Sequence, residues 1–157
     1  MIIMPAPKKH DAKPAQPSKA EIEQELQKKY IELQMLKQHI NAIVQQKQAI
    51  DERQAELRVT IDALKNMNGI KKGEEIWSSL GSGAFVKSDI KDTSSVLVAV
   101  GAGVVVQENL PRAVEILESR LKDMDAISRD VIQQAEAYAE RINKLEPEVE
   151  QLAEQLG

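Results

Sequence analysis

The stretch Ile76–Glu108, IWSSLGSGAFVKSDIKDTSSVLVAVGAGVVVQE, is the only part of the chain with the sequence character of β-strands. Short runs of β-branched and aromatic residues alternate there with glycine-containing links, Gly81-Ser82-Gly83 and Gly101-Ala102-Gly103 among them. This arrangement is typical of β-hairpins. The sequence therefore predicts two hairpins, built from strands over residues 74–80, 84–90, 95–100 and 104–108.

These hairpins need partners outside the chain. An isolated two-stranded hairpin is at best marginally stable in water, and the sequence on both sides of the stretch has a helical pattern. We therefore predict that the stretch is an assembly platform that meets the strands of other subunits. Its contacts are expected from apolar strand residues: Phe85, Val86, Val96, Val98, Val100, Val104 and Val106.

Composition narrows the class of protein. A chain of 157 residues is expected to form one domain, but 3% aromatic and 29% charged residues favour long helices with a narrow apolar seam. A net charge of −4 argues against a nucleic-acid surface, and the absence of cysteine excludes disulfides and thiolate chemistry. No apolar run has the length of a signal peptide or membrane span, so we expect a soluble cytoplasmic protein without membrane contacts.

A first long helix is predicted over residues 18–68. Residues 1–17 carry four prolines among Lys, Ala and Gln, which predicts a disordered tail. Ser18 and Glu21 form a capping box that starts the helix, and Gly69 is expected as a left-handed cap at its end. Its seam recurs at alternating steps of three and four residues: Ile22, Leu26, Lys29, Leu33, Leu36, Ile40, Ile43, Lys47, Ile50, Gln54, Leu57, Ile61 and Leu64.

A second long helix is predicted over residues 110–157, after Asn109 as N-cap and with Pro111 in its first turn. Its seam has the same spacing: Val114, Leu117, Leu121, Met124, Ser128, Val131, Ala135, Tyr138, Ile142, Leu145, Val149, Leu152 and Leu156. Laid antiparallel, the two seams match from Leu64 facing Val114 to Ile22 facing Leu156. Heptads of this length specify a coiled coil. The predicted fold is mainly α: an antiparallel coiled-coil hairpin over 18–157, joined by a small β module at 69–109.

No residue set in the sequence predicts catalysis or a cofactor. The two glycine-rich links lack the flanking pattern of a phosphate-binding loop, so hairpin turns explain them better. His10 and His39 stand apart from each other and do not make a metal-ligand set. Nothing brings together a nucleophile, a base and an oxyanion site. We expect that the protein is not an enzyme and has no metal or cofactor.

The two ends of the helical pattern predict a binding surface. Ile22 and Leu26 face Leu156 and Leu152 at the open end of the hairpin, and Pro147 removes a backbone hydrogen bond nearby. A frayed end would expose these apolar side chains within a rim of glutamates, an arrangement suited to apolar partners. The alternative is an ordinary coiled-coil end that stays closed.

The central segment of the chain resembles the alpha subunits of archaeal prefoldins. It spans Gly83–Leu117 and has the sequence GAFVKSDIKDTSSVLVAVGAGVVVQENLPRAVEIL. The likeness lies in Gly83–Lys87, in the Lys91-Asp92-Thr93 turn, in Val98–Val104 and in Ala113–Leu117. Two hairpins rather than one favour the alpha class. The sequence departs from the family in its tail before Ser18 and at Trp77-Ser78-Ser79-Leu80, where an aliphatic pair and a proline are more usual.

The resemblance implies a hexamer of two alpha and four beta subunits whose hairpins form a β-barrel platform. It also implies an ATP-independent chaperone that holds unfolded proteins at its coiled-coil tips and passes them to a group II chaperonin. The client-binding residues would then be Ile22, Leu26, Leu152 and Leu156. The alternative from another class is a structural coiled-coil tether or scaffold, with closed tips and hairpins that serve only to assemble it.

Overall fold

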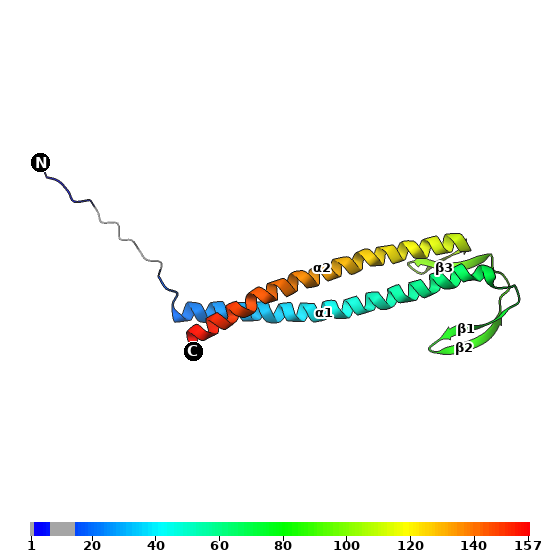
Figure 1. Cartoon of the computed structure of the whole chain (residues 1–157), viewed down its shortest axis with the longest axis horizontal. Helices are drawn as coiled ribbons and strands as arrows, with labels where there is room; N and C mark the ends of the chain where they lie inside the picture. Colours follow the sequence, from blue (N-terminus) through cyan, green and yellow to red (C-terminus); the bar gives the residue numbers. More distant parts are fainter. Residues whose placement is uncertain (1, 7–14) are drawn as a thin grey trace. The chain divides into compact units, whose positions relative to one another are not determined.

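The computed structural model describes residues 2–6 and 15–157 and contains two long helices with two β-hairpins between them (Figure 1). The helix α1 spans Lys19–Asn66, and a 3₁₀ turn follows at Met67–Gly69. The strands are β1 at Glu75–Gly81, β2 at Ala84–Asp89, β3 at Ser95–Gly101 and β4 at Val104–Asn109, and α2 spans Leu110–Leu156.

The chain divides into two compact units, which are described separately. The terminal unit comprises Met1–Ile40 with Ala137–Gly157, and the central unit comprises Asn41–Glu136. Both long helices pass through both units. The predicted disordered tail over residues 1–17 includes residues 1 and 7–14, which lie outside the described residues.

The start of α1 confirms the predicted capping box. The Ser18 N–H donates to Glu21 Oε2 at 2.8 Å, and the Glu21 N–H donates to Ser18 Oγ at 3.3 Å. These bonds satisfy two backbone donors that the first helical turn leaves without a partner.

The predicted left-handed cap at Gly69 is wrong. Gly69 ends the 3₁₀ turn and is not among the residues with a positive φ angle. The Ile70 N–H donates to the Met67 carbonyl at 3.1 Å. Because the last turn tightens in this way, a backbone carbonyl at the helix end is satisfied without a left-handed residue.

The second helix begins as the sequence predicts. Asn109 Oδ1 accepts from the Arg112 N–H at 2.9 Å, and Pro111 lies in the first turn, where a missing N–H costs little. Pro147 lies on the exposed side of α2, and the helix continues through it to Leu156.

Burial confirms both predicted seams. Every seam residue of α1 and α2 is buried or partly buried, the polar members Lys29, Lys47, Gln54 and Ser128 included. The large apolar residues that are exposed on the helices all lie off the seams: Tyr30, Ile31, Met35, Val44, Val59, Ile127 and Ile132. The heptad pattern therefore separates the packed face of each helix from its outer face.

In the terminal unit, ion pairs between the helices agree with the predicted register. Lys29 Nζ lies 2.5 Å from Glu148 Oε2, and Lys37 Nζ lies 2.9 Å from Glu146 Oε1. Arg141 donates to both carboxylate oxygens of Glu32, at 2.7 and 3.1 Å. Each pair joins residues at or beside seam positions that are opposite or adjacent to one another in the antiparallel alignment.

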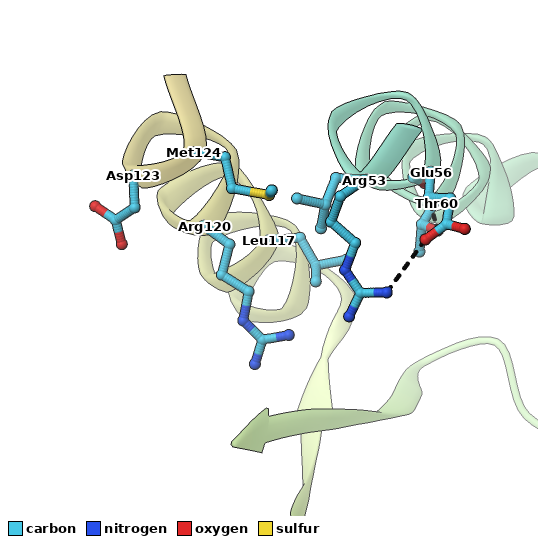
Figure 2. Close-up of a pocket in the computed structure, with 8 residues that line it drawn as sticks. Arg53, Glu56, Thr60, Leu117, Arg120, Asp123 and Met124 are labelled. Atoms are coloured by element: carbon cyan, nitrogen blue, oxygen red, sulfur yellow. Dashed lines mark hydrogen bonds and ion pairs between the residues drawn. The ribbon is translucent and has the colours of Figure 1, made fainter. Parts of the chain in front are cut away.

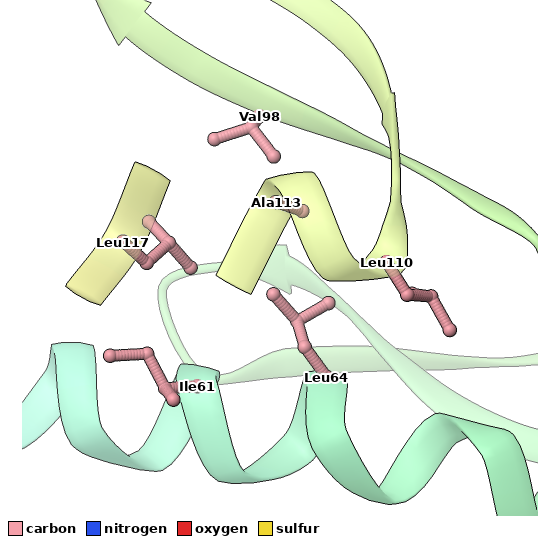
Figure 3. Packing of buried hydrophobic residues seen from close by; sticks show 6 residues of the cluster. All are labelled: Ile61, Leu64, Val98, Leu110, Ala113 and Leu117. Carbon is pink, nitrogen blue, oxygen red and sulfur yellow. The ribbon is translucent and has the colours of Figure 1, made fainter. Parts of the chain in front are cut away.

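The central unit has the same register. Gln54 is 6% exposed and donates from Nε2 to Asp125 Oδ1 at 2.6 Å. Lys65 Nζ pairs with Glu118 Oε1 at 2.8 Å. Beyond these contacts the helices meet β3 in an apolar cluster. Figure 3 shows its buried members: Ile61, Leu64, Val98, Leu110, Ala113 and Leu117.

The two hairpins are separate two-stranded antiparallel sheets, β1 with β2 and β3 with β4. The turn residues Ser82 and Gly83 have φ angles of 50° and 78°, and Ala102 and Gly103 have 51° and 75°. Two consecutive positive φ angles match the twist of the flanking strands, as in type I′ turns. The predicted turns at both glycine-rich links are therefore confirmed.

The register generates a cross-linking prediction. The chain has no cysteine of its own, so Leu33→Cys can be combined with Leu145→Cys or with Val149→Cys, one helical turn away. A turn displaces the second position by about 6 Å, more than disulfide geometry tolerates. We expect oxidation of the first pair to give an intramolecular disulfide at least about fivefold faster, measured by non-reducing electrophoresis. Equal rates, or disulfide-linked dimers, would contradict this register.

Candidate assembly and binding surfaces

The β3–β4 hairpin has one face in the chain's own core and one face in solvent. Val98 pairs with Val106 in the ladder, and Val98 is 6% exposed against residues of both helices. On the opposite face Leu97 pairs with Gln107, and Ala99 pairs with Val105. Leu97 is 73% exposed. Because opposite residues of a ladder share a face, Leu97 and Val105 form an outward apolar surface, termed here the outer face of β3–β4.

The β1–β2 hairpin has apolar residues exposed on both faces. Trp77 is paired with Lys87, and Ser79 with Phe85, on one face. Trp77 is 65% exposed, and the Lys87 ammonium lies 5.8 Å from its ring centroid. On the other face Val86 is paired with Ser78 and is also exposed. No residue of this hairpin belongs to the apolar cluster of Figure 3.

The predicted assembly residues therefore fall into different environments. Phe85, Val86, Val100 and Val104 are exposed, as a contact surface requires. Val96 and Val106 are partly buried, and Val98 is a core residue of the chain itself. Sequence reasoning left out Leu97 and Val105. Their alternation with Val98 and Val106 indicates a second face of the hairpin, but it does not indicate which face meets the helices.

The terminal unit carries an apolar groove of about 440 Å³ between its two helices. Its surface comes from Leu26 and Tyr30 of α1 and from Val149 and Ala153 of α2, with Glu23 and Gln27 beside them. Tyr30 is 53% exposed. These residues form the terminal groove, a concave apolar surface of the size that small-ligand pockets have.

The opposite side of the terminal unit is polar. A hollow of about 230 Å³ is lined there by Glu25, Lys29, Glu148, Gln151, Leu152 and Gln155. A hydrogen bond from Lys29 holds the pKa of the Glu148 carboxyl below its ordinary value, and the bond from the Arg141 guanidinium does the same for Glu32. The same bonds raise the pKa of Lys29 and of Arg141. Ion pairs thus hold the two helices together beside the groove.

The four predicted client-binding residues are partly buried in the structure. Ile22, Leu26, Leu152 and Leu156 all keep their seam positions in the terminal unit. Leu26 lines the terminal groove, whereas Leu152 lines the polar hollow. Tyr30 was missed because it lies one position outside the heptad seam, where sequence reasoning expects a solvated side chain.

A hollow in the central unit has charged groups above an apolar floor (Figure 2). It has a volume of about 400 Å³, and Leu57, Leu117 and Met124 form the floor. At its rim Arg53 is 3.2 Å from Glu56, and Arg120 donates to the Ala99 carbonyl of β3. The Arg120 bond joins α2 to β3, whereas the Arg53 pair lies within α1.

Residues 2–6 and 15–157 contain no group of three or more His, Cys, Asp or Glu side chains placed to hold a metal ion. Neither long helix has, in its described part, a segment apolar enough to cross a membrane.

Two long helices paired along heptad seams, with two β-hairpins between them, define a class of coiled-coil proteins. The family profile described as "Prefoldin subunit" matches residues 36–155, and the chain belongs to the prefoldin family. Its role is accordingly that of a chaperone subunit.

Similar proteins place the chain in the alpha class. It is 30% identical over 138 residues to a prefoldin subunit alpha of Methanococcus aeolicus, a match that covers 85% of this chain and 94% of the relative. It is 29% identical over 125 residues to a prefoldin subunit alpha of Archaeoglobus fulgidus, covering 78% and 91%. The fold matches a chain of the filamentous PFD of Methanocaldococcus jannaschii with a TM-score of 0.67 and 20% identity, over 74% of this chain and 97% of the other.

The ion pairs predict how stability depends on pH. Glu32 and Glu148 have a lower pKa in the folded chain than when unfolded. Their contribution to stability is therefore present above the unfolded pKa of about 4.3, and it is lost as the pH falls through the folded value. We expect the melting temperature to decrease from about pH 5 downward, and the variant Glu32→Gln with Glu148→Gln to show a smaller decrease.

The control is Glu136→Gln with Glu150→Gln, because these carboxylates take no part in the two ion pairs. Melting is followed by circular dichroism at 222 nm at several pH values. An acid-induced decrease of the same size in the Glu32 and Glu148 variant and in the wild type would contradict a stabilising role for the ion pairs.

Proposed function

We propose that this subunit binds unfolded proteins at the terminal groove, assembled with beta-type prefoldin subunits in the cytoplasm. The proposed complex has two alpha and four beta subunits joined in a β-barrel platform. It acts without ATP and passes its clients to a group II chaperonin. The observation that carries this proposal is the apolar terminal groove, in a chain of the prefoldin family.

The chemistry of the groove suits a client without a fixed sequence. Apolar contact is non-directional, so Leu26, Tyr30, Val149 and Ala153 can receive many different apolar side chains. Burial of one Leu-sized side chain contributes roughly 1.5–3 kcal/mol, too little for tight binding at a single groove. Several grooves in one complex raise the effective concentration, so weak contacts combine into useful affinity. Release then requires only a competing apolar surface.

The hairpins support the assembly part of the proposal. Leu97 and Val105 on β3–β4 and Trp77 and Phe85 on β1–β2 are exposed large apolar residues on two-stranded sheets. Two-stranded sheets have unpaired edges, and exposed apolar faces of this kind mark interaction surfaces. We propose that strands of neighbouring subunits pair with these edges and pack on these faces.

The alternative is a structural tether that assembles through its hairpins and has no client. A tether requires only a continuous seam with charged flanks. The apolar composition of the terminal groove and the exposure of Tyr30 favour the chaperone, since a tether has no use for either.

The assembly surface predicts different outcomes for neighbouring strand positions. Leu97→Asp with Val105→Asp places charges on the outer face of β3–β4 and should abolish oligomers while the helical circular dichroism remains. Val98→Asp instead buries a charge among the cluster residues of Figure 3, so it should unfold the central unit. Size-exclusion chromatography with light scattering, together with circular dichroism, separates the two results. A wild-type mass for the double variant would refute assembly through this face.

The binding surface predicts a selective loss of chaperone activity. Tyr30→Ser with Ala153→Glu removes the exposed aromatic ring and places a charge in the terminal groove. Both positions are exposed, so folding and assembly should change by no more than about 0.5 kcal/mol. We expect the variant complex to lose most of its ability to suppress aggregation of a chemically unfolded protein, followed by light scattering.

The matched control is Ile127→Ser with Ile132→Glu, which changes two exposed aliphatic residues of α2 in the central unit. This control should suppress aggregation as the wild type does. Equal activity of the groove variant and the wild type would show that clients bind elsewhere, and equal loss in both variants would show that binding is not localised to the groove.

A further inference from the structure

The N-terminal residues carry apolar side chains that the fold does not use. Ile2, Ile3 and Met4 are 96%, 89% and 87% exposed, the largest exposed fractions among the large apolar residues described. Three consecutive large apolar side chains in contact with water are unfavourable unless they have a binding partner.

The terminal groove lies within reach of this segment. Both belong to the terminal unit. The chain from Met4 to Ser18 can extend over at most about 50 Å. Leu26 lies only about 12 Å along α1 from Ser18, and Tyr30 about 18 Å. Covalent geometry therefore permits residues 2–4 to enter the groove of their own chain.

Charge favours the same encounter. The sequence between Met4 and Ser18 contains Lys8, Lys9 and Lys13 but only one acidic residue, Asp11, so its net charge is positive. The helix ends that flank the terminal groove are acidic, with exposed or partly exposed glutamates at positions 21, 23, 25, 148, 150 and 154. Attraction between opposite charges acts over about 8–10 Å at physiological salt and requires no fixed contact.

We propose that Ile2, Ile3 and Met4 occupy the terminal groove of their own chain and compete there with clients. This inference rests on the proposed function of the groove. Because the segment is tethered, its binding is intramolecular and a weak contact suffices for partial occupancy. A client then meets only the free fraction of grooves, which weakens its apparent affinity by the inverse of that fraction. The tail thus weakens the binding of all clients by the same factor, and clients with more apolar surface retain more affinity.

Cross-linking tests where the segment binds. Met4→Cys is combined with Ala153→Cys in the groove, or with Gln155→Cys in the polar hollow on the other side of the unit. We expect the pair with position 153 to oxidise several-fold faster, in the full-length assembled protein and as a disulfide within one chain. Equal rates, or a disulfide between two chains, would overturn binding in the chain's own groove.

Client affinity tests the competition. The probe is fluorescently labelled, reduced and carboxymethylated α-lactalbumin, which stays unfolded without denaturant. Ile2→Ser, Ile3→Ser and Met4→Ser together should tighten its binding about two- to fivefold, as expected if half to four-fifths of the grooves are occupied by the tail. The control also replaces three tail residues but leaves Ile2, Ile3 and Met4 in place: Ala15→Ser, Gln16→Ser and Pro17→Ser. This control should bind the probe with the affinity of the wild type. Unchanged or weaker binding by the first variant would overturn the proposal.

The groove variant Tyr30→Ser with Ala153→Glu separates this inference from the proposed function. If it binds the probe as the wild type does, the groove is not the client site and both proposals fail. If it loses binding while the Ile2, Ile3 and Met4 variant equals the wild type, the client site stands and only the competition by the tail is refuted.

Discussion

The register of the two helices depends on where the polar side chains within the seam find partners. Buried Gln54 donates to Asp125, and Lys29 pairs with Glu148. Sliding α2 by one heptad in one direction would place Lys29 beside Arg141, a like charge. Sliding it in the other direction would place Gln54 beside Ile132, which offers no acceptor. Because an unsatisfied buried polar group costs about 1–3 kcal/mol, these few residues exclude alternative registers that the apolar residues alone would tolerate.

A seam of this kind buries little apolar surface, and the consequence is visible on both units. In the central unit Val98 of β3 packs on the apolar residues at the end of the seam, and Leu97 stays in solvent. The β1–β2 hairpin contributes no residue to this cluster. In the terminal unit Leu26 and Tyr30 stay accessible in a groove. The apolar surface that a compact domain would bury is thus available for other subunits and for other chains. This is the physical basis on which the assembly and client-binding proposals rest.

Sequence reasoning expected apolar residues on the hairpins and at the helix ends, but it did not identify every side chain that is exposed there. The run Val96–Val100 indicates a strand with apolar residues on both faces, and nothing in the run tells which face meets the helices. Val98 and Leu97 therefore could not be assigned to the core and the outer face before the packing was known. Tyr30 presents the same difficulty: it lies beside the seam of α1, and the groove that it lines forms only together with Val149 and Ala153 of α2.

The sequence by itself determined the elements and their pairing: the capping box at Ser18, the N-cap at Asn109, the seam residues and the hairpin turns all follow from local or periodic patterns. Such features depend on neighbours within a few residues or on a repeat, so they can be derived without coordinates. Only the structure showed how α1 ends: the backbone forms a 3₁₀ turn at Met67–Gly69, and Gly69 does not adopt a left-handed conformation. Burial of Val98, exposure of Leu97 and the terminal groove were decided by tertiary packing, because each depends on side chains far apart in the sequence that meet only when the helices and strands are in place.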